Sequence, residues 1–321
     1  MKFFKIVKLT ILLLCLLLLS VGCANQQGQQ AGQSSLSYEV TDSRGNVIKL
    51  QRKPQRIVSL SISTDEILIG LVPPERIAAL TYLADDGGLS NITEQAKAIA
   101  AKTRANPEAV IALQPDLVIV PDWQPAEFVQ TVRDAGIAIY IYKSPNTIEE
   151  IKTVILELAQ AVGEQQAGKK LVNDMDSALD RVVAKVRQIP AEQRPVVIRF
   201  TLMGGTGGKG TTFDDICSYA GVQNGAAIAG LAMNDLLAKE QLVKVNPDIL
   251  LMPTWDYTGK TDMDQFKASI QNDPALQSVK AIRQQKLAQI PDRFLYCTSQ
   301  YIVFGVQELA SYAYPQYFEQ K

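Results

Sequence analysis

The chain has 321 residues, with 32 basic and 33 acidic side chains, four cysteines and no histidine. The near balance of charge argues against nucleic acid as a partner, and the lack of histidine removes the commonest metal ligand and general base. The cysteines are too few for a zinc cluster and none forms a CxxC motif.

Residues 1–22 have the pattern of a cleaved secretion signal. Lys2, Lys5 and Lys8 precede an uncharged apolar run of 14 residues, Leu9–Gly22. This run is shorter than the roughly 20 residues that a bilayer-spanning helix needs. Without the three lysines the chain keeps 29 basic and 33 acidic residues, a formal charge of about −4.

The junction Leu19–Cys23 resembles the lipobox of bacterial lipoproteins, in which the cysteine is acylated and becomes the new N-terminus. We therefore expect Cys23 to anchor the protein at a membrane, since two acyl chains suffice for stable anchoring. An ordinary signal peptide with an incidental cysteine is the alternative, and it also implies an extracytoplasmic location. Residues 23–37 carry no charge and no aromatic side chain, so they are expected to form a flexible tether.

Alternating strands and helices predict a first α/β lobe over residues 38–163. We expect a hairpin at 38–50 around Gly45, and Ser63–Glu66 as the cap of a helix over 67–71. Buried strands are predicted at 56–60, 116–120 and 137–142, and helices at 126–135 and 147–162. Short apolar strands separated by helices are typical of a parallel or mixed sheet covered on both faces.

Residues 164–187 have apolar side chains at helical spacing and predict one helix of about 35 Å. A second α/β lobe follows over residues 188–321, with buried strands at 196–200 and 249–252 and a glycine-rich mobile loop at 204–210 that we expect near the cleft. The fold class is therefore α/β, with two Rossmann-like lobes joined by one long α-helix.

An internal repeat supports the similarity of the two lobes. Residues 108–123 align with residues 240–255 at an offset of 132, and a Glu, a Pro-Asp pair, a Pro and a Trp coincide. The match includes both tryptophans of the chain, which favours duplicated lobes related by a pseudo-twofold axis. A common strand-entry motif used twice without symmetry is the alternative.

Ligands of open α/β sheets bind beyond the carboxyl ends of the strands, and Trp123 and Trp255 follow such ends, one in each lobe. Aromatic walls suit a flat or bulky ligand, and arginines can bind an anion. Each aromatic residue alone fits a core position as well, and each arginine a solvated surface. Besides the tryptophans, the candidate ligand-binding residues are Tyr82, Tyr257, Arg199, Arg293, Phe294 and Tyr296, with Tyr142 and Arg104 as further neighbours.

The motifs do not indicate an enzyme. Gly204–Gly210 is not a phosphate-binding loop, because Lys209 is followed by Gly210 and not by Ser or Thr. No histidine is present to activate a serine or cysteine, and there is no GxSxG elbow. Cys217 and Cys297 could form a disulfide in an oxidising compartment or remain buried thiols.

Several segments resemble the substrate-binding proteins of ABC importers for ferric siderophores, haem and cobalamin, whose lobes are joined by a single long helix. The resemblance covers roughly residue 38 to the C-terminus. The motifs that carry it are PQRIVSL at 54–60, TDE at 64–66, the segments 106–120 and 164–187, and AGVQN at 220–224.

This resemblance implies a monomeric, non-enzymatic protein that delivers a small solute to an ABC permease dimer. The family docks through one surface glutamate on each lobe, which corresponds here to Glu108 and Glu240, and opposite charge steers such an encounter. Without histidine, the ligand is expected to be a metal chelate, a ferric siderophore or a corrinoid, with no cofactor and no protein-bound metal. The alternative is a surface lipoprotein of the same fold that acts as a sensor or adhesin or binds a different solute.

Overall fold

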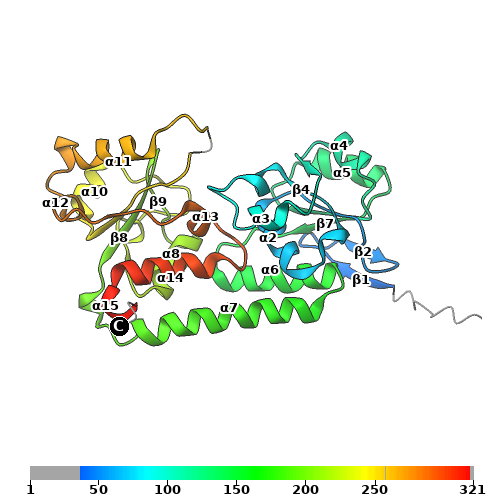
Figure 1. Ribbon diagram of the computed structural model, residues 1–321, viewed down its shortest axis with the longest axis horizontal. Helices are drawn as coiled ribbons and strands as arrows, with labels where there is room; N and C mark the ends of the chain where they lie inside the picture. The colour runs from blue at the N-terminus through cyan, green and yellow to red at the C-terminus, as the bar shows by residue number, and fades with distance from the viewer. Residues whose placement is uncertain (1–36, 257, 319–321) are drawn as a thin grey trace, which may run out of the picture.

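The computed structural model describes residues 37–256 and 258–318. Two α/β lobes lie side by side on a layer of helices, of which α7 (Gln165–Val186) runs beneath both lobes (Figure 1). Its 22 residues correspond to about 33 Å. The predicted signal peptide, Cys23 and the tether up to residue 36 lie outside the described residues, as does Tyr257.

The first lobe contains a five-stranded parallel sheet in the order β5-β4-β3-β6-β7. Its strands are β3 (Ile57–Ser59), β4 (Ile77–Thr81), β5 (Lys102–Thr103), β6 (Leu117–Pro121) and β7 (Ile139–Tyr142). The helices of this lobe are α2 (Ile62–Leu71), η1 (Pro74–Arg76), η2 (Tyr82–Asp85), α3 (Thr93–Ala96), α4 (Pro107–Ala112), α5 (Ala126–Asp134) and α6 (Ile148–Ala161). The parallel α/β arrangement agrees with the predicted fold class.

The predicted hairpin is confirmed at the start of the first lobe. Strands β1 (Tyr38–Thr41) and β2 (Val47–Leu50) pair antiparallel. Gly45 in the turn has a φ of +80°, a conformation that glycine adopts without steric cost.

The prediction of a helix over residues 67–71 was wrong at its N-terminus. Helix α2 begins at Ile62, because Ser61 caps it by accepting a hydrogen bond from the amide of Thr64. Asp65 and Glu66 therefore lie within the helix, and both side chains are buried. They contact other elements of the molecule and do not cap a helix.

The second lobe has a sheet in the order β10-β8-β11-β12, parallel throughout, with β9 added antiparallel to β8. Its strands are β8 (Val196–Thr201), β9 (Gly204–Thr206), β10 (Gln223–Asn224), β11 (Ile249–Leu251) and β12 (Leu287–Ala288). Its helices are η3 (Ala191–Gln193), α8 (Thr212–Tyr219), α9 (Gly225–Ile228), α10 (Lys239–Val245), α11 (Met263–Gln271), η4 (Pro274–Leu276), α12 (Lys280–Arg283), α13 (Asp292–Leu295), α14 (Ile302–Ala313) and α15 (Pro315–Phe318).

The prediction that residues 204–210 form a loop was wrong for the first three of them. Gly204, with a φ of +124°, starts β9, and the amide of Lys209 donates to the carbonyl of Leu231 at 2.8 Å. The segment is thus fixed by β8 at its start and by Leu231 at Lys209. Its glycines permit close backbone approach, since a Cβ on Gly208 would lie 2.3 Å from the carbonyl oxygen of Leu231.

The two copies of the sequence repeat have the same local structure. Asp116 and Asp248 each follow a proline, and each carboxylate accepts hydrogen bonds from the backbone at the start of the neighbouring strand, from Gln55 and Arg56 in the first lobe and from Val196 in the second. These contacts align β6 with β3 and β11 with β8, so the repeat marks an equivalent unit in each lobe.

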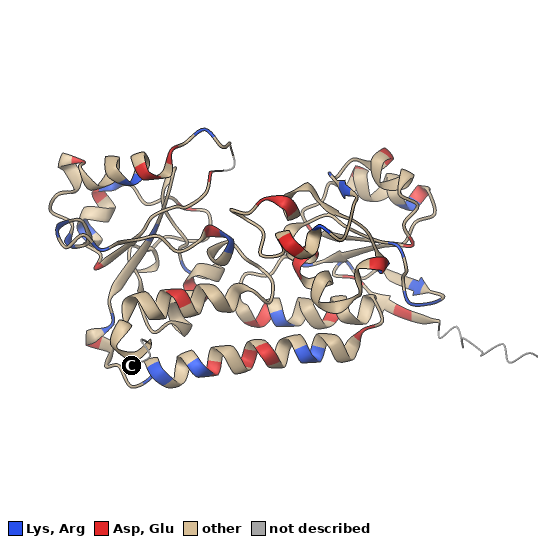
Figure 2. Cartoon of the chain, viewed as in Figure 1, with Lys and Arg blue, Asp and Glu red and all other residues tan. Residues whose placement is uncertain are grey.

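The hydrophobic core is continuous between the lobes along α7. One buried cluster joins α6, α7, α8 and α14, with Leu158, Met175, Leu179, Ile216 and Val306 among its members. Figure 2 shows acidic and basic residues interspersed along α7. A shared core and an uninterrupted helix are expected to limit the motion of the lobes.

No helix within the described residues is long and apolar enough to cross a membrane. In the same part of the chain, no group of three or more Cys, Asp or Glu side chains is placed to hold a metal ion.

Candidate functional site

A cavity of about 520 Å³ lies at the carboxyl ends of the parallel strands of the first lobe. Each strand is followed by a residue that lines it: Ser61 after β3, Tyr82 after β4, Arg104 after β5, Trp123 after β6 and Ser144 after β7. This is the position at which open α/β sheets bind their ligands. The other lining residues are Leu60, Ile62, Ser63, Thr81, Leu83, Thr103, Ala105, Tyr142, Pro145 and, from the second lobe, Thr298.

The walls of the cavity are aromatic with one cationic group. The guanidinium of Arg104 lies 3.4 Å from the centre of the Tyr82 ring, a cation–π contact. Trp123 is 65% exposed and Tyr82 45% exposed, so both rings have free surface. The residues that line this cavity include no carboxylate and no thiol.

The floor of the cavity is a network of hydroxyl groups. Ser61 contacts the hydroxyl of Tyr142 at 2.8 Å and that of Thr64 at 2.9 Å, and Thr64 contacts Ser59 at 2.5 Å. Ser61 and Tyr142 line the cavity and can offer hydrogen bonds to a ligand. Burial raises the pKa of the Tyr142 hydroxyl, so it stays protonated.

A buried carboxylate lies directly behind this floor. Asp65 accepts hydrogen bonds from the backbone amide of Thr81 at 3.1 Å and from its hydroxyl at 2.5 Å. Burial is the largest influence and raises the pKa of Asp65 to about 7. Thr81 lines the cavity, so a single residue separates the Asp65 carboxyl group from the space that a ligand would occupy.

The second tryptophan is placed differently from the first. Trp255 does not line the cavity; its indole nitrogen donates to both carboxylate oxygens of Asp86 in the first lobe, at 3.1 Å each. The structure therefore does not bring Trp123 and Trp255 together as two walls of one cavity.

The remaining candidates from the described part of the second lobe also lie outside the cavity wall. Arg199 donates to the carbonyl of Leu295 at 3.2 Å and lies 4.5 Å from the centre of the Tyr296 ring, and burial lowers the pKa of its guanidinium. Arg293 donates to the carbonyl of Gly87 and lies over Phe294. Phe294 packs edge-on against Phe304 at 5.4 Å.

The sequence prediction missed most of the polar groups of the cavity. Ser61, Ser63, Thr81, Thr103 and Thr298 carry hydroxyls that line it. Ser61 and Ser63 come shortly after the predicted strand 56–60, which was the available signal for these two; Thr81 and Thr103 end strands β4 and β5, which were not predicted. Hydroxyl residues are so common in turns that this signal is weak without the tertiary structure.

The lobes meet at a buried carboxylate, Glu66 of α2. It accepts hydrogen bonds from the amide of Asn91 at 2.9 Å and from Cys297 and Ser299 of the second lobe at 3.2 and 2.5 Å. Burial raises the pKa of Glu66. Cys297 and Cys217 are both free and buried, and burial raises the pKa of each thiol.

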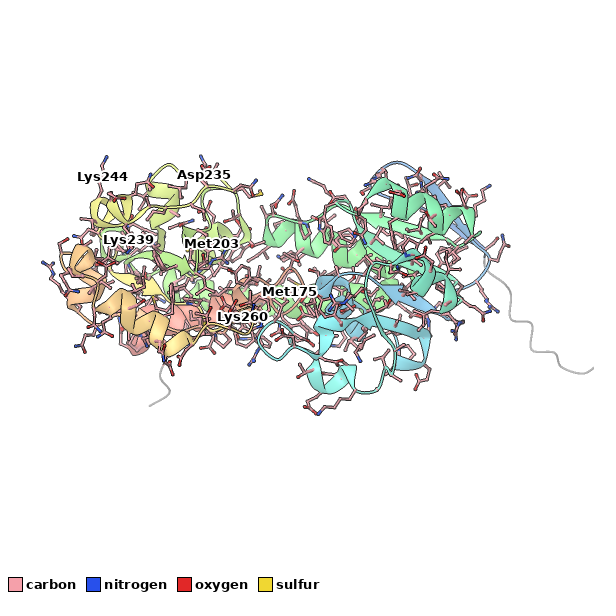
Figure 3. The ribbon with its side chains drawn as sticks, turned by 90° about the horizontal axis from the view of Figure 1, so that it is seen from above. Met175, Met203, Asp235, Lys239, Lys244 and Lys260 are labelled. Atoms are coloured by element: carbon pink, nitrogen blue, oxygen red, sulfur yellow. The ribbon has the colours of Figure 1, made fainter. Side chains whose placement is uncertain are left out.

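Glu108 and Glu240 occupy equivalent positions near the start of α4 and α10, and both are exposed. The two helices lie on the side of their lobes away from α7 (Figure 1). Seen from above, Lys239 and Lys244 of α10 lie toward the outer end of the second lobe, away from Met175 at the middle of the molecule (Figure 3).

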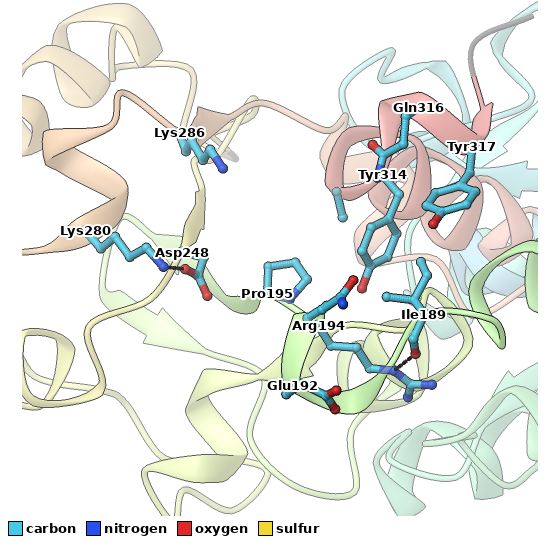
Figure 4. Close-up of a pocket in the computed structure, with 12 residues that line it drawn as sticks. Ile189, Glu192, Arg194, Pro195, Asp248, Lys280, Lys286, Tyr314, Gln316 and Tyr317 are labelled. Atoms are coloured by element: carbon cyan, nitrogen blue, oxygen red, sulfur yellow. Dashed lines mark hydrogen bonds and ion pairs between the residues drawn. The ribbon is translucent and has the colours of Figure 1, made fainter.

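A second hollow of about 330 Å³ lies on the second lobe (Figure 4). It opens at the amino ends of the strands, beside Pro195, Asp248 and Lys286. Lys280 forms an ion pair with Asp248, which also holds the start of β8. This is the end of a parallel sheet opposite to the one where ligands bind, so we assign it no role in solute binding.

Comparison with known proteins agrees with this geometry. Residues 57–294 match the family model described as periplasmic binding protein. An uncharacterized ABC transporter substrate-binding lipoprotein of Bacillus subtilis, YvrC, is 26% identical over 312 residues, or 93% of this chain and 94% of the relative. The iron-uptake system-binding protein of the same organism is 23% identical over 298 residues, or 87% and 89%. Relatives also include cobalamin-binding proteins of Halobacterium salinarum.

The fold is similar to that of the molybdate periplasmic binding protein MolA of Haemophilus influenzae. The two structures have a TM-score of 0.72 at 19% identity, over 88% of this chain and 92% of that protein. At this identity the likeness concerns the fold alone.

Proposed function

Because the chain belongs to the periplasmic binding protein family and is the non-enzymatic substrate-binding component of an ABC transporter, with relatives that serve iron uptake and bind cobalamin, we propose that it captures a metal chelate. The solute, a ferric siderophore or a corrinoid, enters the cavity of the first lobe and passes from there to the permease. Iron uptake and cobalamin binding by the relatives support both kinds of ligand.

The observation that carries this proposal is the chemistry of the cavity wall. Its aromatic rings, hydroxyl groups and single guanidinium suit an organic anion. A bare metal ion needs carboxylate, thiolate or imidazole ligands, and the lining residues provide none. The metal must therefore arrive inside its own organic shell.

We assign Trp123, Tyr82 and Arg104 to direct contact with the solute, with Ser61 and Tyr142 as hydrogen-bonding partners. Arg199, Phe294 and Tyr296 do not line the cavity, and we keep them as candidates for a solute that extends from it toward the second lobe. Tyr257, which lies outside the described residues, stays a candidate on the sequence prediction alone.

Delivery requires attachment and docking. We propose that Cys23 carries the lipid that holds the protein at the outer face of the membrane, as the lipobox-like sequence and the lipoprotein relative suggest. Glu108 and Glu240 are exposed at equivalent places on the two lobes, so they suit a permease dimer with basic residues at matching positions.

Calorimetric titration tests the ligand assignment. The protein is titrated with ferric siderophores of catecholate, hydroxamate and carboxylate type, with cobalamin, with haem, and with free ferric ion in citrate. Saturable submicromolar binding of one chelate class, weakened at least tenfold in Trp123→Ala and unchanged in Tyr312→Ala, an exposed aromatic residue away from the cavity, is the expected result. Absence of binding by every chelate would overturn the proposal and favour a sensor or adhesin of the same fold.

A further inference from the structure

A loop of the first lobe accepts hydrogen bonds from two side chains of the second lobe. The loop is Asp86–Gly88, which follows η2. Trp255 donates from its indole nitrogen to the Asp86 carboxylate at 3.1 Å, and Arg293 donates from its guanidinium to the carbonyl of Gly87 at 3.0 Å. Hydrogen bonds from two separate side chains thus cross from one lobe to the other at this place.

The indole ring also covers the backbone of the loop. A Cβ atom on Gly88 would lie 2.0 Å from Cδ1 of Trp255, whereas a Cβ on Gly87 would meet no atom within 4 Å. Only glycine at position 88 therefore leaves room for the ring. The neighbouring glycine has no such constraint.

Trp255 and Arg293 are both positioned by Asp292 of the second lobe. Asp292, which is buried, accepts hydrogen bonds from the amides of Thr254 at 2.7 Å and Trp255 at 3.0 Å. Arg293 is the next residue along the chain. Trp255 and Arg293 therefore move together with the start of α13.

The loop Asp86–Gly88 is also fixed by hydrogen bonds within the first lobe. Asp86 accepts a hydrogen bond from the amide of Gly88 at 2.9 Å, and its carbonyl accepts from Ser90 at 2.7 Å. The loop continues directly from η2, whose residue Tyr82 lines the solute cavity. Its position is therefore coupled to one wall of the cavity.

We infer that Trp255 and Arg293 form a latch with the loop Asp86–Gly88 that holds the two lobes together in the absence of solute. The latch is only half-buried, unlike the buried junction at Glu66, so it can open while the shared core along α7 stays intact. Opening releases η2 and Tyr82, which lets the cavity admit a solute larger than its closed volume of about 520 Å³. Trp255 thus acts between the lobes, and Trp123 acts on the solute.

Fluorine NMR of the fluorotryptophan-labelled protein tests the latch without any ligand, so its result does not depend on which solute the cavity takes. The chain contains two tryptophans, and Trp255→Phe assigns the two resonances. In Asp86→Ala and in Gly88→Ala we expect the Trp255 resonance to shift toward its position in the denatured protein, while the Trp123 resonance keeps its folded position. The control Gly87→Ala should leave both resonances in place.

Small-angle X-ray scattering of the same variants supplies a second readout. An increased radius of gyration in Asp86→Ala and Gly88→Ala, with wild-type thermal unfolding, would support a latch whose release separates the lobes. A Trp255 resonance that stays at its wild-type position in both variants would overturn the inference. An equal shift in Gly87→Ala would overturn it as well, because that substitution meets no part of Trp255.

Discussion

Glu66 and Ser299 share a hydrogen bond of 2.5 Å that joins the first lobe to the second inside the protein. The same carboxylate oxygen accepts from the thiol of Cys297, and the other oxygen accepts from Asn91. One buried side chain therefore satisfies donors from both lobes, and its removal leaves several of them without a partner.

We predict that Glu66→Ala lowers the free energy of unfolding by roughly 2–4 kcal/mol, because buried donors that lose their acceptor carry their full desolvation cost. Denaturant unfolding measures the change. Glu127→Ala, at an exposed position of α5, is the control and should shift the free energy by less than about 0.5 kcal/mol. An unchanged midpoint for Glu66→Ala would show that the junction contributes little to stability.

The pH dependence of stability should report Asp65. Burial raises its pKa from an ordinary value of 3.8 to about 7 in the folded protein, so the folded state binds this proton more tightly than the unfolded state. The stabilisation is complete below about pH 4 and is lost as the pH rises through about 7. Asp65→Asn, which cannot ionise, should remove this loss.

Urea unfolding from pH 4 to pH 8 measures the contribution of Asp65. The wild-type protein should lose on the order of a few kcal/mol over this interval relative to the Asp65→Asn variant. Asp116→Asn is an unsuitable control, because Asp116 holds the start of β3. The exposed Asp180→Asn serves instead. Parallel pH profiles for wild type and Asp65→Asn would contradict the prediction.

Arg104 should contribute to affinity through both its charge and its planar shape. We predict that Arg104→Ala weakens binding of an anionic chelate by about 10- to 100-fold, the range for loss of a charge-assisted hydrogen bond. Arg104→Lys should recover only part of this loss, because an ammonium cannot bind a carboxylate or catecholate in a bidentate fork. Titration calorimetry at two salt concentrations measures both effects. Equal affinity of all three proteins would remove Arg104 from the site.

Charge reversal at Glu108 and Glu240 should separate docking from solute binding. We predict that Glu108→Lys combined with Glu240→Lys abolishes solute uptake by cells while the purified protein binds the solute with wild-type affinity. Glu127→Lys combined with Glu192→Lys reverses two other exposed charges and should leave uptake unchanged. Uptake that persists in the Glu108 and Glu240 variant would place the docking surface elsewhere.

Much of the architecture follows from local patterns in the sequence. The hairpin around Gly45, the buried strands and the long helix α7 were predictable, because alternation, apolar runs and helical spacing depend on neighbouring residues alone. The repeat was visible for the same reason, because it is a match of residue types along the chain. The structure adds that Gln114 and Asn246, which lie 132 residues apart, share a left-handed backbone with φ of +49° and +52°. Each ends a helix before a Pro-Asp pair that aligns the next strand.

The start of α2 was predicted incorrectly although its cap is local, since Ser61 accepts a hydrogen bond from the amide of Thr64. The burial of Asp65 and Glu66 within the helix depends on tertiary contacts. The run from Ser63 to Glu66 is typical of a solvent-exposed cap, yet Asp65 and Glu66 are buried because Thr81, Asn91 and Ser299 supply hydrogen bonds from elsewhere in the molecule. A buried charge is tolerated only where such partners exist, and no local pattern reports them.

By itself the sequence determined the absence of histidine chemistry, the repeat shared by residues 108–123 and 240–255, and the prediction that a ligand binds beyond the strand ends. Only the tertiary structure decided that Trp123 faces the cavity while Trp255 crosses to Asp86. The physical reason is that the two tryptophans occupy equivalent places in the repeat, but the Trp255 ring finds a partner in the opposite lobe, Asp86, whereas Trp123 stays largely exposed at the cavity. Gly88 leaves space for an indole ring, and the ring of Trp255 reaches that space only because the second lobe packs beside the first.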